Sequence, residues 1–173
     1  MKRILLSLLV FCFACQLTAQ ENFRWEIIDS IPKTKEQLYT ETKLFIADYW
    51  KAAQKVIQND DKEGGIIVVK GLTCCTKTQF LASYTYCYDY TVTIMIKDQK
   101  FRFIIDDVFF NDQASDAVMH VKKASDTPPD LGDMKIGVTK NWGYEIMGYI
   151  KSDLQYIADS FTDYIRKNNI TDW

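Results

Sequence analysis

The sequence predicts a single α+β domain with the element order β-α-β-β-β-α, in which an antiparallel sheet has helices packed on one face. Residues 84–97 alternate tyrosine or aliphatic side chains with mostly polar ones, the period of a half-buried strand. Residues 38–57 and 142–165 instead place apolar side chains at helical spacing. The 173 residues are 47% hydrophobic and include only 7 Gly and 3 Pro, which is typical of one globular core.

Residues 1–19 are predicted to be a secretory signal peptide, which leaves residues 20–173 as the mature domain. Lys2 and Arg3 precede the apolar run Ile4–Ala14, the order of a signal sequence. That run is about half of the ~20 residues that a membrane span needs. We therefore expect an exported protein, periplasmic or extracellular, with no membrane span in the mature chain.

The first strand is predicted at residues 23–31, and it ends before Pro32, which has no backbone N–H to donate to a sheet. A helix follows, because Thr34 and Gln37 are spaced as a capping box. Its apolar positions recur through Ile57, and a glycine-containing turn at 59–65 is expected to end it.

Three further strands are predicted at Ile66–Leu72, 84–97 and Phe101–Phe109, with Cys74 and Cys75 on a loop after the first of them. The last two strands are joined by the two-residue turn Asp98-Gln99, which fixes their register. The expected pairs on the helix-covered face are Ile96–Phe101, Ile94–Phe103 and Val92–Ile105, and those on the opposite face are Met95–Arg102, Thr93–Ile104 and Thr91–Asp106.

A long connection at residues 111–140 precedes the C-terminal helix, which is predicted to end near residue 168. Connections of this length are uncommon in compact domains and are either functional or mobile. The chain's single histidine, His120, lies in it. Because no second histidine or serine nucleophile motif accompanies His120, we predict a protein that is not an enzyme, with a hydrolase using His120 as the alternative.

The cysteines divide between the signal and the domain. Cys15 offers an alternative to signal cleavage, lipidation, although Cys12 is a poor residue three places before a lipidated cysteine. In the mature chain Cys74, Cys75 and Cys87 remain. Two interpretations stay open for them: buried free thiols, which we favour, and a disulfide between one of the vicinal pair and Cys87, assigned as Cys75–Cys87.

No metal or other cofactor is predicted. Residues 59–64 place oxygen-bearing side chains before a glycine in the manner of an EF-hand calcium loop, but Lys70 stands where the twelfth-position glutamate is required. A turn between a helix and a strand explains the segment better.

The chain resembles a family of small bacterial exported proteins that contain a domain of unknown function with a TATA-binding-protein-like (TBP-like) fold. The resemblance lies in Lys33–Tyr39, which opens the amphipathic helix, in Val56–Lys70 and in Tyr90–Phe103, so that it covers about residues 25–110. It implies a curved antiparallel sheet with helices on one face, and it implies no activity.

A nucleic-acid partner is not expected despite that fold name. Removing the two basic residues of the signal from the 21 in the chain leaves 19 Lys and Arg against 23 Asp and Glu, a net charge of −4. Nucleic-acid binding depends on clustered basic residues. Asp89 and Asp106 outnumber Arg102, the one basic side chain expected on the open sheet face.

Our leading hypothesis is a non-enzymatic binding or interaction module of the cell envelope, with an unknown envelope protein or glycan as its partner. The expected contacts are the open-face residues and two tyrosines placed beyond the helices: Tyr84, Tyr86, Thr91, Thr93, Met95, Arg102 and Ile104. The long connection at 111–140 is the other expected contact. The alternative is a carrier of a small apolar ligand, with a pocket between the sheet and the C-terminal helix.

Overall fold

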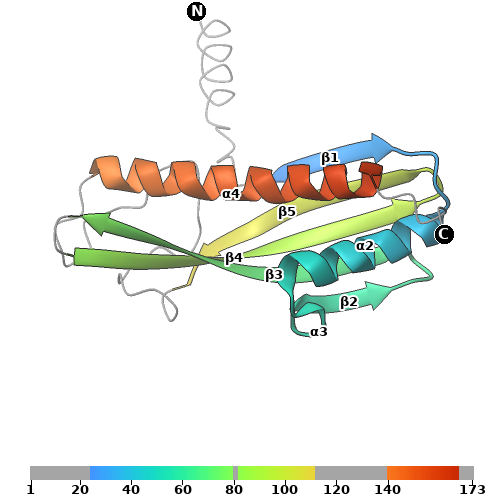
Figure 1. Ribbon diagram of the computed structural model, residues 1–173, viewed down its shortest axis with the longest axis horizontal. Helices are drawn as coiled ribbons and strands as arrows, with labels where there is room; N and C mark the ends of the chain where they lie inside the picture. Colours follow the sequence, from blue (N-terminus) through green and yellow to red (C-terminus); the bar gives the residue numbers. More distant parts are fainter. Residues whose placement is uncertain (1–23, 80–81, 112–139, 168–173) are drawn as a thin grey trace, which may run out of the picture.

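The computed structural model describes residues 24–79, 82–111 and 140–167 (Figure 1). Its elements are β1 (Trp25–Ser30), α2 (Lys35–Trp50), α3 (Ala53–Val56), β2 (Ile57–Asp61), β3 (Ile66–Gln79), β4 (Ala82–Lys97), β5 (Lys100–Phe110) and α4 (Lys140–Lys167). The strands form one antiparallel sheet in the order β1-β5-β4-β3-β2. The predicted α+β class is confirmed.

The helices α2 and α4 lie on the same side of the sheet, which we call the inner face; the opposite side is the outer face (Figure 1). The core between these layers is centred on Phe161 of α4. Its ring centroid lies 5.2 Å from that of Phe45 in α2, and 5.1 and 4.6 Å from those of Phe101 and Phe103 in β5. One side chain therefore joins both helices to the sheet.

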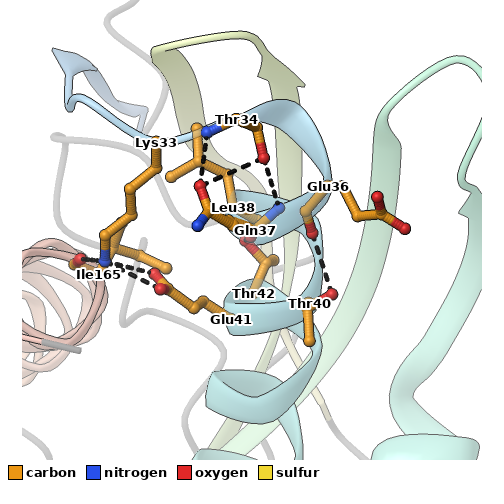
Figure 2. Close-up of polar contacts among 9 residues, drawn as sticks. All are labelled: Lys33, Thr34, Glu36, Gln37, Leu38, Thr40, Glu41, Thr42 and Ile165. Atoms are coloured by element: carbon orange, nitrogen blue, oxygen red, sulfur yellow. Dashed lines mark hydrogen bonds and ion pairs between the residues drawn. The ribbon is translucent and has the colours of Figure 1, made fainter. Parts of the chain in front are cut away.

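The capping box predicted for α2 is confirmed (Figure 2). The Gln37 backbone N–H donates to Oγ1 of Thr34 at 3.3 Å, and the Thr34 backbone N–H donates to Oε1 of Gln37 at 2.9 Å. Two backbone donors that the first turn of a helix leaves without partners are satisfied in this way.

A buried ion pair links the start of α2 to the end of α4 (Figure 2). The Lys33 ammonium donates to both carboxylate oxygens of Glu41, at 2.9 and 2.7 Å, and to the backbone carbonyl of Ile165 at 2.6 Å. A cation at the last carbonyls of a helix also complements the negative end of its dipole. Lys33 thereby fixes where the C-terminal turn of α4 packs.

The predicted register of β4 and β5 is confirmed for all six pairs. Gln99, in the turn that sets this register, has φ 59°. This left-handed conformation is normally taken by Gly or Asn, because a Cβ atom is unfavourable there. Hydrogen bonds brace the turn, since the backbone N–H of Ile31 donates to the Gln99 carbonyl at 3.0 Å and the Gln99 N–H donates to the Lys33 carbonyl at 2.9 Å.

The predicted continuous helix through Ile57 is wrong. The helix α2 ends at Trp50, because Lys51 takes a left-handed φ of 55° and acts as its C-cap. The short helix α3 follows, and Ile57–Asp61, in part assigned to a turn from the sequence, forms the edge strand β2. Pairing with β3 supplies the backbone hydrogen bonds that this polar segment would not secure alone.

The predicted loop at Cys74 and Cys75 is also wrong, because both residues lie within β3. Cys74 stands directly opposite Cys87 of β4, and these two form a disulfide. Successive strand residues point to opposite faces, so Cys75 faces away from Cys87 and keeps a free thiol. The assignment Cys75–Cys87 is therefore corrected to Cys74–Cys87, and the free-thiol interpretation holds for Cys75 alone.

Several predicted features lie outside the described residues: the signal at 1–19, His120 and all but the ends of the connection at 111–140. Within the described part of the chain, no helix is long and apolar enough to cross a membrane.

Candidate functional site

The outer face carries most of the predicted contact surface. Thr91, Thr93 and Met95 of β4 are half-buried there, beside Arg102 and Ile104 of β5. Ile104 is almost fully buried, so its contribution to an accessible surface is small. The alternation along β4 and β5 thus predicted the correct face for all five residues.

Charged side chains on the outer face neutralise one another. Glu26 accepts from Arg24 at 3.2 Å and from Arg102 at 2.8 Å, and Arg24 also lies 3.4 Å from the carboxylate of Asp106. The hydrogen bond from Arg24, joined by Arg102, lowers the pKa of Glu26 below its usual range. The two arginines are therefore engaged with carboxylates of the same face.

Three large apolar side chains of the outer face are exposed. They are Ile28 of β1, Leu72 of β3 and Phe109 of β5, with 54, 51 and 38% of their surface accessible. Leu72 and Phe109 flank Asp89 of β4, since each is paired with it in the sheet. The outer face thus combines paired charges with accessible apolar surface.

The predicted exposed contact at Tyr86 is wrong. Tyr86 is buried, as are Tyr88 and Tyr90, and all three point to the inner face beneath the helix layer. Tyr84 pairs with Lys77 in the sheet, but its side chain lies outside the described ones. The tyrosine stripe is core because α4 extends along the sheet beyond the end of α2 (Figure 1), and its Asp153 accepts a hydrogen bond from Tyr88 of β4.

A polar cluster lies within this interface between the sheet and α4. Oδ2 of Asp153 in α4 accepts from the Tyr88 hydroxyl at 2.9 Å and from Sγ of Cys75 at 3.3 Å. Nearby, Nε1 of Trp50 at the end of α2 donates to the Tyr90 hydroxyl at 3.3 Å. Hydroxyl, thiol and indole groups buried at the interface are thus provided with partners.

These surroundings keep the cluster's thiol and hydroxyls protonated. Burial, followed by the hydrogen bond to Asp153, raises the pKa of Cys75 to about 11. Burial is also the main cause that raises the pKa of Tyr88, with the charge of Asp153 second. Burial raises the pKa of Tyr49 to about 12, with smaller contributions from Tyr90, Tyr156 and Asp153.

Two exposed tyrosines border the cluster on α4. Tyr149 and Tyr156 have 52 and 66% of their surface accessible, and Asp153 between them is half-buried. Spacings of four and three residues place all three on one flank of the helix. The hydrogen bonds from Tyr88 of β4 and Cys75 of β3 to Asp153 show that this flank faces the sheet at its buried tyrosines.

Sequence reasoning missed Asp153 and Cys75 as members of a site. The available signal was the position of Asp153, which borders the apolar stripe of the predicted helix and lies between two tyrosines of the same flank. Within the described ranges 24–79, 82–111 and 140–167, no three His, Cys, Asp or Glu side chains gather in a way that could hold a metal ion.

Comparison with known proteins identifies the fold. The family described as "Domain of unknown function (DUF4468) with TBP-like fold" matches residues 26–111. The structure is similar to a DUF4468 family protein from Bacteroides ovatus, at 14% identity and TM-score 0.53, over 80% of this chain and 85% of that one. It is also similar to a TBP-like protein from Parabacteroides distasonis, at 14% identity and TM-score 0.52, over 80% and 92% of the two chains. No curated protein matches the sequence.

Proposed function

Residues 26–111 belong to the DUF4468 family with TBP-like fold, and on that premise we propose that the protein is a non-enzymatic binding module of the cell envelope that contacts its partner through the outer face. The observation that carries the proposal is the accessible apolar surface of Leu72 and Phe109 on the outer face, on either side of Asp89; Ile28 is a separate exposed position, paired with Arg102 farther along the sheet. Leu72 and Phe109 lie close together because both pair with Asp89, and neighbouring exposed apolar side chains of this kind can mark an interaction site.

The charges of the outer face support a protein partner over an anionic polymer. Arg24 and Arg102 are engaged by Glu26 and Asp106, and a phosphate backbone would have to displace these carboxylates. A partner that buries Ile28, Leu72 and Phe109 gains from the hydrophobic effect instead. A glycan, with a sugar ring stacked on Phe109, is the other partner class.

The test is capture of the partner from native cell envelope under mild crosslinking, followed by quantitative mass spectrometry. The variant Ile28→Ser/Leu72→Ser removes apolar surface from the outer face. The matched control is Leu44→Ser, which alters a similarly exposed leucine on α2. We expect one set of proteins enriched by the unaltered chain and by the control, and lost with the outer-face variant. Failure to recover any specific partner, or equal recovery by all three chains, would overturn the proposal.

Export is part of the proposal and has its own test. If residues 1–19 are a cleaved signal, the protein isolated from the envelope fraction begins at Gln20. Mass spectrometry of the intact protein reads this directly. An N-terminal lipid-modified Cys15 would show the lipoprotein alternative, and an unprocessed chain in the cytoplasmic fraction would contradict export.

The absence of enzymatic activity is likewise proposed from the chemistry of the described groups. The raised pKa of Cys75 works against a thiolate nucleophile near neutral pH.

The apolar-carrier alternative is less well supported, because Tyr86, Tyr88 and Tyr90 themselves fill the inner face under α4. This region instead has a partly exposed edge, which is lined by polar as well as aromatic side chains.

A further inference from the structure

The border of the polar cluster forms a surface that we call the tyrosine shelf. Its members are Tyr149, Asp153 and Tyr156 of α4, Tyr49 and Trp50 of α2, and Cys75 of β3. Cys75 is only half-buried, and beyond the end of α2 the β3 and β4 strands continue beneath α4 alone (Figure 1). Side chains that would be core under a longer α2 therefore border solvent here.

At the centre of the shelf lies the carboxylate of Asp153, which has no cationic partner among the residues that the structure describes. Asp153 accepts hydrogen bonds from the Tyr88 hydroxyl and the Cys75 thiol, which are both neutral donors. In the described part of the chain Asp153 forms no ion pair, whereas Asp29, Asp60 and Glu41 each pair with Lys or Arg. A half-buried negative charge of this kind leaves a negative potential at the shelf.

The aromatic groups around this carboxylate add to that potential. The face of a tyrosine or tryptophan ring is negative and attracts cations, most strongly where water is excluded. Tyr149 and Tyr156 present exposed rings from the same flank of α4 as Asp153. Tyr49 and Trp50 are half-buried on the other side, with their centroids 4.8 Å apart.

From this juxtaposition we propose that the tyrosine shelf binds a small organic cation, with the ammonium group against Asp153 and its alkyl substituents against the rings of Tyr149 and Tyr156. A quaternary ammonium compound fits best, because it needs no hydrogen-bond acceptor and is recognised by aromatic faces together with one carboxylate. The site is separate from the outer face, so either proposal can fail without the other.

The test titrates the protein with choline and, in parallel, with 3,3-dimethyl-1-butanol, the uncharged analogue of the same shape. Binding is followed by isothermal calorimetry and by tyrosine fluorescence. We expect saturable binding of choline with a dissociation constant of about 1 mM or lower, and binding of the neutral analogue at least about tenfold weaker.

Amino-acid substitutions test whether choline binds at the tyrosine shelf. Asp153→Asn keeps a hydrogen-bond acceptor for Tyr88 but removes the charge, and should weaken choline binding about tenfold or more. The matched control is Asp163→Asn, ten residues along the same helix and paired with Lys167, which should leave binding unchanged. Tyr156→Phe, which keeps the ring, should bind nearly as well as the unaltered protein, whereas Tyr156→Ala should not.

Three results would overturn the proposal: no saturable choline binding, equal affinity for choline and its neutral analogue, or an equal loss with Asp153→Asn and Asp163→Asn. Circular dichroism of each variant separates loss of the site from loss of the fold. If Asp153→Asn proves unstable, the comparison of choline with the neutral analogue on the unaltered protein still decides the question.

Discussion

Lys33 combines three roles in one side chain. It neutralises Glu41, which is almost fully buried, it satisfies the Ile165 carbonyl, and its ammonium lies at the negative end of the α4 dipole. A buried ion pair is weak support for net stability, because removing two charges from water is costly. Removing only one partner is more damaging, since the other charge is then buried alone.

We therefore predict that Lys33→Met lowers the free energy of unfolding by about 3–5 kcal/mol. The second variant is Lys33→Met/Glu41→Leu, which removes both charges and should recover most of the loss. Urea denaturation followed by circular dichroism measures both. A double variant as unstable as the single one would show that the carbonyl contact with Ile165, rather than the ion pair, carries the stabilisation.

The environment of Cys75 makes its thiol unreactive near neutral pH. Its pKa is raised to about 11, mainly by burial and then by the Asp153 carboxylate. A raised pKa means that the unreactive thiol persists to higher pH, and at pH 8 only about one thiol in a thousand is ionised. The vicinal pair Cys74-Cys75 thus contains one disulfide sulfur and one protonated thiol.

We predict that Cys75 in the native protein resists iodoacetamide at pH 8, and that its labelling rate rises steadily as the pH approaches 11. Peptide mapping by mass spectrometry follows this site alone. The same peptide in denaturant, where the thiol has its ordinary pKa, provides the reference rate. Native labelling at pH 8 as fast as in denaturant would contradict the assignment.

At the scale of elements, the Cys74–Cys87 disulfide cross-links the two strands of the β3–β4 hairpin near its free end. The bridged residues are 13 apart in sequence. In the chain-entropy model, a cross-link of about 15 residues stabilises by about 3 kcal/mol, because it restricts the unfolded chain. This part of the hairpin extends beyond the end of α2 (Figure 1).

Replacing both cysteines, as Cys74→Ser/Cys87→Ser, should lower the free energy of unfolding by about 2–3 kcal/mol. Urea titration of the variant against the unaltered chain measures the loss, and the unaltered chain under reducing conditions should show a similar one. Cys75→Ser, which retains a donor for Asp153, is the control and should change stability by less than about 1 kcal/mol. Loss of stability on Cys75→Ser alone would point to the polar cluster as the stabilising feature.

The elements that the sequence predicted well are those defined by local pattern. The β4–β5 register follows from alternation and a two-residue turn, and the α2 start follows from Thr34 and Gln37. The strand β2 could not be found this way, because Gln58 to Asp61 are polar and exposed and become a strand only by pairing with β3. The end of α2 was missed because apolar spacing continues past Lys51, whose left-handed conformation leaves no composition signal.

The two candidate sites differ in the same way, because local pattern predicted the outer face but not the tyrosine shelf. The alternating pattern of the strands predicted that Thr93 and Arg102 lie on the outer face, because successive residues of a strand point to opposite faces. The tyrosine shelf brings Asp153 against Cys75, which is 78 positions away. No local pattern encodes that contact, because it depends on how α4 lies across the sheet.

At the scale of the whole molecule, the family match and the core do not have the same extent. The match covers residues 26–111, yet α4, at 140–167, contributes Phe161 and much of the inner-face packing. The matched sheet and α2 would expose their apolar inner face to water without α4. We infer that α4 is an integral part of the folding unit.

This inference predicts that Phe161→Ala destabilises the sheet and the helices together. Truncation of a fully buried phenylalanine costs about 3–5 kcal/mol through lost burial and the cavity left behind. Far-UV circular dichroism reports on the helices. In a background that carries Trp142→Phe and Trp173→Phe, the fluorescence of Trp25 and Trp50 reports on β1 and the end of α2. Because Phe161 contacts α2 and β5 at once, both probes should shift to the same lower urea midpoint. The control is Tyr156→Ala at an exposed site, which should change the free energy of unfolding by only about 0.5 kcal/mol. Separate transitions for the two probes would instead mean that α4 docks on a sheet that is stable without it.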